Sequence, residues 1–126
     1  MKYLALLTFI VVSIIGCGQP ERNCKDFRTG EFKYEVELDG ERLTGKFTRY
    51  QEIQVEIYSD HKVDSSTINW VNDCEFIAKN LHPKSMADKK PLLFKILTTD
   101  SDSYTFEFSY VGDVTNRHKG IATKID

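Results

Sequence analysis

Alternation of apolar and polar residues dominates the chain beyond residue 30 and predicts β-strands. We expect strands at residues 32–38, 43–50, 53–58, 92–98, 104–110 and 120–125. The strand at 53–58 has two faces, with Ile53, Val55 and Ile57 on one and Gln54, Glu56 and Tyr58 on the other. Asp39-Gly40 is a typical hairpin turn, and residues 59–66 are predicted to form a polar loop.

Residues 67–81 fit two patterns. One set of apolar residues is spaced as in a single long strand: Ile68, Trp70, Cys74 and Phe76. A second set is spaced as in a helix, namely Val71, Cys74, Ile77 and Leu81. Asn72 and Glu75 could also form a helix capping box. We favour one strand that continues to residue 78, because the neighbouring elements are predicted strands, and we expect a loop at residues 81–90.

Seven or eight short strands with turns at short intervals predict an all-β domain. The short connections favour an antiparallel meander, and closure into a curled sheet or a lipocalin-like barrel would remove exposed strand edges. The interior of an eight-stranded barrel is either filled by side chains or just wide enough for one small ligand. The sequence leaves these two alternatives open.

The first seventeen residues indicate export. Lys2 precedes an apolar run over residues 4–15, which is too short for a membrane-spanning helix and typical of a signal peptide. Ile14-Ile15-Gly16-Cys17 resembles the lipobox of bacterial lipoproteins, which implies acylation of Cys17 and cleavage before it. We therefore expect a signal peptide at 1–16, a lipidated tether at 17–23 and a single β domain at 24–126.

This export signal predicts a protein of the bacterial cell envelope, outside the cytoplasm and anchored to a lipid bilayer through Cys17. The outer membrane is favoured over the inner membrane. Cys24 and Cys74 would then lie in an oxidising compartment, where a disulfide is expected between them. The alternative is a pair of buried free thiols.

The charged and polar residues predict neither a nucleic-acid partner nor a catalytic centre. The formal net charge is −2, whereas nucleic-acid-binding domains are basic. The three histidines, His61, His82 and His118, fall in predicted loops without metal-ligand spacing. Ser59-Asp-His-Lys62 matches the Ser-x-x-Lys pattern of penicillin-binding enzymes, but the companion motifs are absent. Because no Gly-x-Ser-x-Gly motif or phosphate-binding glycine loop is present either, we expect neither enzymatic activity nor a metal or organic cofactor.

An aromatic set forms the candidate core or ligand pocket: Trp70, Phe76, Tyr104, Phe106, Phe108 and Tyr110. Trp70 lies close in sequence to Cys74, and a large aromatic beside a disulfide commonly fills a small core. The alternative is a pocket lined by Trp70 and the aromatic residues of the strand 104–110.

Five short segments carry a resemblance to a family of small, uncharacterised bacterial lipoproteins. They are residues 24–27, 30–32, 70–76, 95–98 and 120–124, with Trp-Val-Asn-Asp-Cys-Glu-Phe as the longest. Similar chains sometimes carry the name DNA topoisomerase IV, which does not suit an exported acidic chain without a nucleotide-binding loop. In size and layout the chain is also similar to lipocalin-like barrels and lipoprotein lysozyme inhibitors. The Gly-x-Trp signature of lipocalins is absent, since Asn69 and Ile68 precede Trp70.

Together these features favour a membrane-anchored, non-enzymatic module that binds or scaffolds another envelope protein. The alternative hypothesis is a carrier or sensor that holds a small apolar ligand inside the barrel. An enzyme is a remote third hypothesis.

The lipobox generates a first prediction. Replacing Cys17 by Ser removes the thiol that would receive the lipid, so the protein should move from the membrane fraction to the soluble envelope fraction. Fractionation with immunodetection measures this, and persistence of the Cys17→Ser variant in membranes would contradict lipidation at this residue.

Overall fold

A computed structural model of the chain describes residues 21–126. The expected signal peptide, the lipidation site Cys17 and the first part of the tether lie outside the described residues. Within residues 21–126, no helix has the length and apolar character needed to cross a bilayer.

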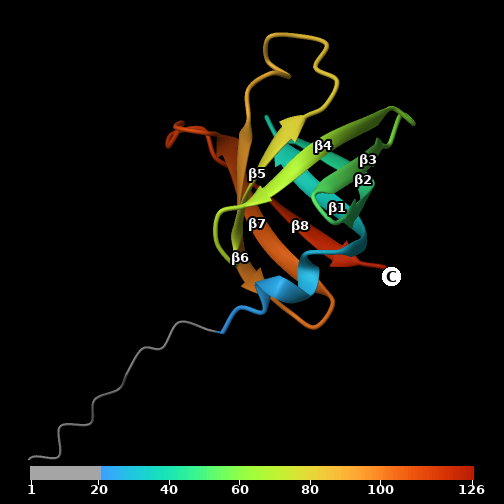
Figure 1. Ribbon diagram of the computed structural model, residues 1–126, viewed down its shortest axis with the longest axis vertical. Helices are drawn as coiled ribbons and strands as arrows, with labels where there is room; N and C mark the ends of the chain where they lie inside the picture. Colours follow the sequence, from blue (N-terminus) through green and yellow to red (C-terminus); the bar gives the residue numbers. More distant parts are fainter. Residues whose placement is uncertain (1–20) are drawn as a thin grey trace, which may run out of the picture.

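Eight antiparallel strands form a closed barrel after a short 3-10 helix, η1 (Cys24–Phe27) (Figure 1). The strands are β1 (Gly30–Leu38), β2 (Glu41–Tyr50), β3 (Ile53–Tyr58), β4 (Val63–Trp70), β5 (Glu75–Asn80), β6 (Leu92–Thr99), β7 (Ser103–Tyr110) and β8 (His118–Lys124). Each strand pairs with the next one along the chain, and pairing of β1 with β8 closes the barrel. The predicted all-β meander is therefore confirmed, and the barrel is the form that it takes.

The turn between β1 and β2 is the one that the sequence predicts. Asp39 and Gly40 have φ angles of 52° and 80°. Positive φ at both central residues is typical of a type I′ turn, whose twist matches that of the two strands it joins. The register then pairs Leu38 with Glu41 and places Val36 opposite Leu43 on the inner face.

The prediction of one strand over residues 67–78 is wrong, because a turn at residues 71–74 divides it into β4 and β5. The Asn72 side chain accepts a bond from the Cys74 backbone N–H at 2.9 Å and donates to Glu75 Oε2 at 2.6 Å. The residues that fit a capping box therefore stabilise a hairpin. Trp70 and Phe76 are cross-strand partners, so both keep the inward direction that a single strand would have given them. Residues 63–66, predicted as loop, belong to β4.

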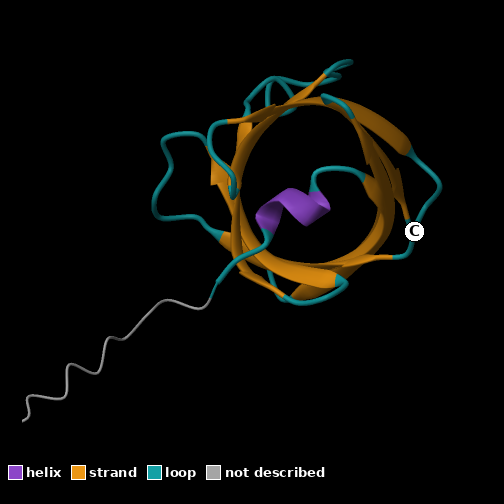
Figure 2. Ribbon diagram, turned by 60° about the horizontal axis from the view of Figure 1, so that its bottom comes forward, coloured by secondary structure: helices purple, strands orange, loops and turns teal. Residues whose placement is uncertain are grey.

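The two ends of the barrel differ. At one end, here called the closed end, η1 lies across the ring of strands, as Figure 2 shows. The connections β2–β3, β4–β5 and β6–β7 lie at this end, and the C-terminal residue accepts a backbone bond from Glu31 there. The other end, here called the open end, carries the loops at residues 39–40, 59–62, 81–91 and 111–117.

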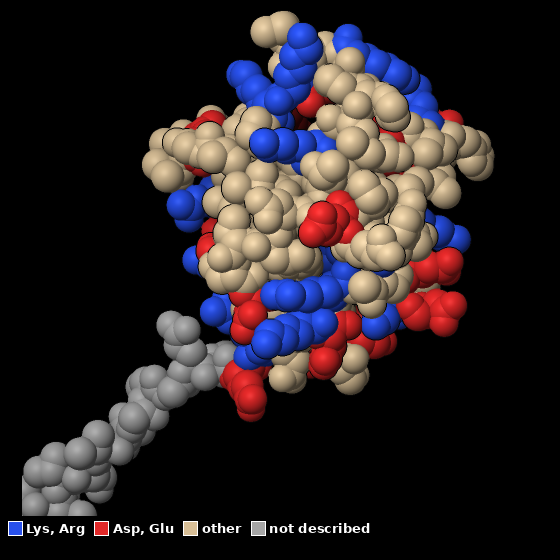
Figure 3. Space-filling model, viewed as in Figure 1, with Lys and Arg blue, Asp and Glu red and all other residues tan. Residues whose placement is uncertain are grey.

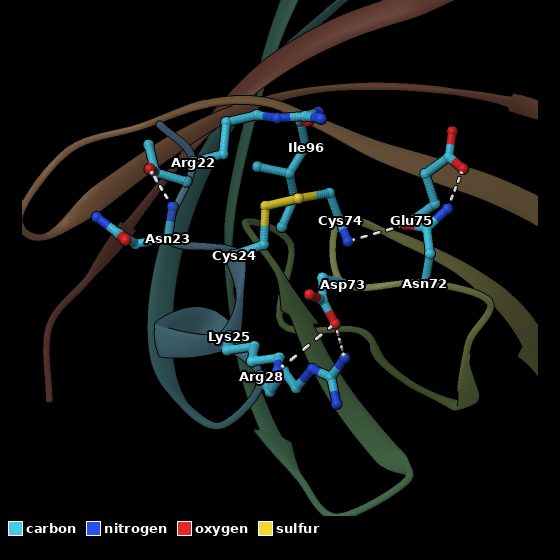
Figure 4. The surroundings of a disulfide bond; sticks show 11 residues. Arg22, Asn23, Cys24, Lys25, Arg28, Asn72, Asp73, Cys74, Glu75 and Ile96 are labelled. Carbon is cyan, nitrogen blue, oxygen red and sulfur yellow. Dashed lines mark hydrogen bonds and ion pairs between the residues drawn. A yellow bond between two sulfur atoms is a disulfide. The ribbon is translucent and has the colours of Figure 1, made fainter. Parts of the chain in front are cut away.

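The helix η1 is tied to the closed end by covalent and hydrogen bonds (Figure 4). The expected disulfide joins Cys24 of η1 to Cys74 of the β4–β5 turn. Just before η1, the Asn23 backbone N–H donates to Thr99 Oγ1 at 2.9 Å, and Arg22 Nη1 donates to the Ile96 carbonyl at 2.9 Å. These contacts fix η1 to β6 and to the β4–β5 turn, so that it acts as a plug.

Side chains fill the barrel next to the plug. Phe27 of η1 is 1 % exposed and packs on the ring of Tyr104, with a centroid separation of 5.2 Å. Phe32 of β1 and Phe47 of β2 stack at a centroid separation of 4.8 Å. The buried cluster consists of Cys24, Phe27, Phe32, Tyr34, Val36, Phe47, Ile96, Tyr104, Phe106 and Ala122.

The disulfide generates a second prediction. It closes a loop with a sequence separation of 50, for which the chain-entropy model gives about 4 kcal/mol of stabilisation. A Cys24→Ser, Cys74→Ser double variant should lose about that much free energy of unfolding, measured by guanidinium denaturation. A loss below about 1 kcal/mol would show that the bond hardly constrains the unfolded chain.

Candidate ligand cavity

A cavity of about 430 Å³ occupies the barrel between the filled core and the open end. This volume lies within the range of small-molecule sites in proteins. Its mouth includes Ser59, Asp60 and Lys62 of the β3–β4 loop, and its deepest part reaches Arg49 and Tyr104. Most of its wall is apolar: Val36, Leu38, Leu43, Phe47, Phe76, Leu92, Phe94, Phe106 and Phe108.

Three stacked phenylalanines make one side of this wall. Phe94 of β6 lies between Phe76 and Phe108, at centroid separations of 4.9 and 5.3 Å and interplanar angles of 7° and 17°. The strand register creates the stack, because Phe76 pairs with Phe94 and Phe94 pairs with Phe108. Cross-strand aromatic pairs stabilise a sheet and limit the freedom of the rings. The stack gives the cavity a preformed aromatic surface.

The structure brings together four of the six aromatic residues in the candidate set. Phe76, Tyr104, Phe106 and Phe108 line the cavity. Tyr110 does not, because it ends β7 at the rim, is 39 % exposed and lies 5.3 Å from the Lys90 ammonium group.

Trp70 also lies away from the cavity wall. It packs at the closed end against Phe76, with the Arg28 guanidinium 4.9 Å from its ring centroid. The Trp70 side chain points into the barrel, as its strand position predicts, but it lies in the filled core below the cavity.

Arg49 of β2 forms the polar part of the cavity floor and is 1 % exposed. Its Nη1 donates to the Phe27 carbonyl at 2.8 Å, and its Nε donates to Gln54 Oε1 at 3.0 Å. Its Nη2 donates to the Tyr104 hydroxyl at 3.2 Å. The guanidinium therefore connects the plug, β3 and β7 through acceptors that carry no charge.

Aromatic rings surround the same guanidinium. Its carbon lies 4.6 Å from the Phe76 ring centroid and 5.1 Å from that of Phe47, with Phe32 and Trp70 both at 5.6 Å. Attraction between a cation and an aromatic face is stronger where water is excluded. Within residues 21–126, no carboxylate oxygen lies within 4.0 Å of Arg49. The positive charge is held by rings and neutral acceptors alone.

A second polar group lies higher on the wall, around Glu56 of β3. Burial raises the pKa of the Glu56 carboxyl; hydrogen bonds with Tyr34 and Tyr58 oppose this shift, and the charge of Asp64 adds to it. Burial and the Glu56 charge raise the pKa of both tyrosines, which therefore remain hydrogen-bond donors. Tyr58 also donates to Asp64 Oδ2 at 2.9 Å.

Gly45 allows Tyr34 to reach this group. A Cβ atom at Gly45 would lie 2.5 Å from the Tyr34 hydroxyl oxygen and 2.7 Å from Cζ, so the tyrosine ring occupies the space of the absent side chain. Any larger residue at position 45 would have to displace the ring from Glu56.

The inner face of β3 is its polar face. The register places Glu56 beside Phe47 of β2, which points into the barrel, and Gln54 and Tyr58 share this direction. The apolar face of the strand points outward, with Ile57 46 % exposed. The alternation was visible in the sequence, and the assignment of its faces comes from the structure.

Sequence reasoning did not single out Arg49 or Glu56. Arg49 has the same parity as Phe47 in β2, so a charged residue in an inward position was a detectable signal. For Glu56 no such signal exists, because either face of the strand 53–58 could have been the inner one.

The remaining titratable residues do not converge on a metal site. His61 and His82 are exposed loop residues, as expected. His118 is not in a loop: it begins β8 and lies half-buried, with its ring 5.5 Å from Phe108. In the part of the chain that the structure describes, no group of three His, Cys, Asp or Glu residues is arranged to hold a metal ion.

Comparisons of the chain with protein-family models, curated proteins and solved structures give no match. The cavity must therefore be interpreted from its own geometry.

The Glu56 environment generates a third prediction. Because the folded-state pKa lies above the ordinary value of 4.5, folding favours the protonated carboxyl. The stabilisation from this group is complete below pH 4.5 and is lost as the pH rises through the raised pKa. Glu56→Gln should therefore gain stability relative to the wild type as the pH rises from 4 to 8, measured by denaturant unfolding.

The matched control is Glu35→Gln on the exposed outer face of β1. It should follow the wild-type pH profile. Parallel profiles for wild type and Glu56→Gln would contradict the raised pKa.

Proposed function

We propose that the domain is a non-enzymatic binding module that holds a small, largely apolar molecule inside its barrel. The 430 Å³ cavity carries this proposal, because it joins a rigid aromatic wall to a few polar groups at defined positions. Of the hypotheses that the sequence left open, the geometry of the interior supports the ligand carrier or sensor best.

The position of the plug supports this role for an anchored protein. Arg22 and Asn23 bind β6 at the closed end, and Cys17 precedes Arg22 by five residues. A chain extends at most about 3.6 Å per residue, so an acylated Cys17 would hold the closed end within roughly 18 Å of the lipid. The mouth would then face away from the anchoring membrane, where a ligand can be exchanged with the surrounding envelope.

An apolar pair on the outer surface favours a second function, the binding of another envelope protein. Ile57 and Val63 are cross-strand partners on β3 and β4, with 46 % and 57 % of their surfaces exposed. Exposed apolar patches often mark interaction sites, but isolated apolar residues are common on any protein surface. Two adjacent residues support this function less strongly than a lined cavity supports ligand binding.

The proposed function generates a fourth prediction. Leu92 lies on the cavity wall, so a Leu92→Trp variant places a larger ring in the space that a ligand would occupy. The neutral fluorescent probe N-phenylnaphthylamine should bind the wild type with an increase in emission. Its affinity should fall by about tenfold or more in Leu92→Trp, which corresponds to about 1.4 kcal/mol of binding free energy.

Ile57→Trp is the matched control, because it adds a similar ring to the outer face of the barrel. It should bind the probe as the wild type does. Equal binding by wild type and Leu92→Trp, or loss of binding in Ile57→Trp alone, would place the apolar site outside the barrel and overturn the proposed function.

A further inference from the structure

The guanidinium of Arg49 lines the cavity and keeps unused hydrogen-bonding capacity. An arginine side chain has five N–H donors, and three of them are used by Phe27, Gln54 and Tyr104. Among residues 21–126, two donors and the positive charge have no partner, on a side chain that is 1 % exposed and lines the cavity floor. Burial of a charge without a counter-ion is costly, so an anion at this position would be strongly favoured.

Tyr104 adds another donor at the same place. Its hydroxyl oxygen accepts the bond from Arg49, which leaves the hydroxyl hydrogen to be donated. The residue is 3 % exposed and lines the cavity. An arginine and a hydroxyl that line the same cavity floor, each with donors left, match the oxygens of a carboxylate, the group that arginine binds through paired hydrogen bonds.

The space above this floor suits an apolar chain. Between Arg49 and the mouth, the wall is formed mainly by Leu38, Leu43, Leu92 and the stacked phenylalanines. The carboxyl of Glu56 also lines this space and is hydrogen-bonded to Tyr34.

The opposite polarity, a cationic head held by Glu56 and Asp64, has less support. Tyr34 already binds Glu56, and Tyr58 donates its single hydroxyl hydrogen to Asp64. These carboxylates therefore have donors within the protein, whereas the Arg49 charge has no anionic partner among the described residues.

The surface of the open end is favourable to an approaching anion. The β5–β6 loop carries Lys84, Lys89 and Lys90 and only one acidic residue, Asp88. Figure 3 shows basic side chains gathered at the top of the molecule, where this loop lies. Charge of one sign near a binding site raises the rate at which ligands of the opposite sign associate.

We infer that the ligand is an amphiphile with a carboxylate head and an apolar chain, bound head-inward with its carboxylate on Arg49 and Tyr104. This inference rests on the proposed function and specifies its ligand class.

The test compares three probes with the same chain and different heads: dodecanoic acid, dodecanol and dodecylamine. Each is titrated into the folded domain below its aggregation concentration, and binding is measured by calorimetry. The acid should bind about tenfold more tightly than the alcohol, as expected for charge-assisted hydrogen bonds in a buried site. The acid should also change the emission of Trp70, the single tryptophan, whose ring lies 5.6 Å from the Arg49 guanidinium.

Two variants locate the head group. Tyr104→Phe removes only the hydroxyl and should reduce the preference for the acid severalfold while the alcohol affinity is kept. Tyr50→Phe, which removes the hydroxyl of a half-exposed tyrosine outside the cavity, is the matched control and should keep the preference. Arg49→Met should abolish the preference. Near-ultraviolet circular dichroism shows whether Arg49→Met is folded. If it is not, the inference is tested by the Tyr104→Phe variant and by the ratio of acid to alcohol affinity in the wild type.

The outcomes separate this inference from the proposed function. Equal affinity for acid and alcohol, or tighter binding of the amine, would overturn the carboxylate inference while ligand binding in the barrel stands. A preference for the acid that persists in Tyr104→Phe and Arg49→Met would also overturn it. Binding of N-phenylnaphthylamine without binding of any of the three probes would reject this ligand class, and failure of all four to bind would reject the proposed function as well.

Discussion

The hydrogen bond from the Arg49 guanidinium to the Phe27 carbonyl connects the two parts on which this domain depends, the barrel wall and the plug. Burial of a charge is costly unless its N–H donors find acceptors and its surroundings stabilise the charge. The carbonyl of η1, Gln54 of β3 and Tyr104 of β7 supply the acceptors, and four aromatic rings face the charge. One side chain thereby requires η1, β2, β3 and β7 to hold their positions together, and it forms the boundary between the filled and the hollow part of the interior.

That boundary has a consequence for stability. Near the plug, the core is packed with aromatic rings and reinforced by the Cys24–Cys74 bond. Toward the open end, the barrel encloses a cavity. The side chains that line it lack the packing contacts that a filled core would provide. The disulfide and the plug are concentrated at the end that the chain can fill. The open end is lined by preformed aromatic stacks and by polar groups that satisfy one another, a distribution suited to holding a ligand.

Local patterns in the sequence predicted much of this fold. Period-two alternation located the strands, and Asp39-Gly40 located a hairpin. The predicted export signal led us to expect the disulfide between Cys24 and Cys74. The prediction for the segment around Asn72 was wrong because the same residue types occur in helix caps and in hairpin turns. Which of the two forms depends on the pairing of the following residues with β6. Four of the nineteen residues that line the cavity, three of them aromatic residues of β7, were in the candidate set, whereas the leucines near the mouth were not.

The sequence by itself determined that the chain forms an antiparallel all-β domain with short turns, because strand periodicity and turn residues act through neighbours in the chain. Only the tertiary structure decided which face of β3 points inward, that the interior is hollow at one end, and that Arg49 rather than Trp70 forms the cavity floor. The physical reason is that alternation divides a strand into two faces without saying which is inside. That choice depends on barrel closure and on long-range partners such as the plug, to which no local pattern refers.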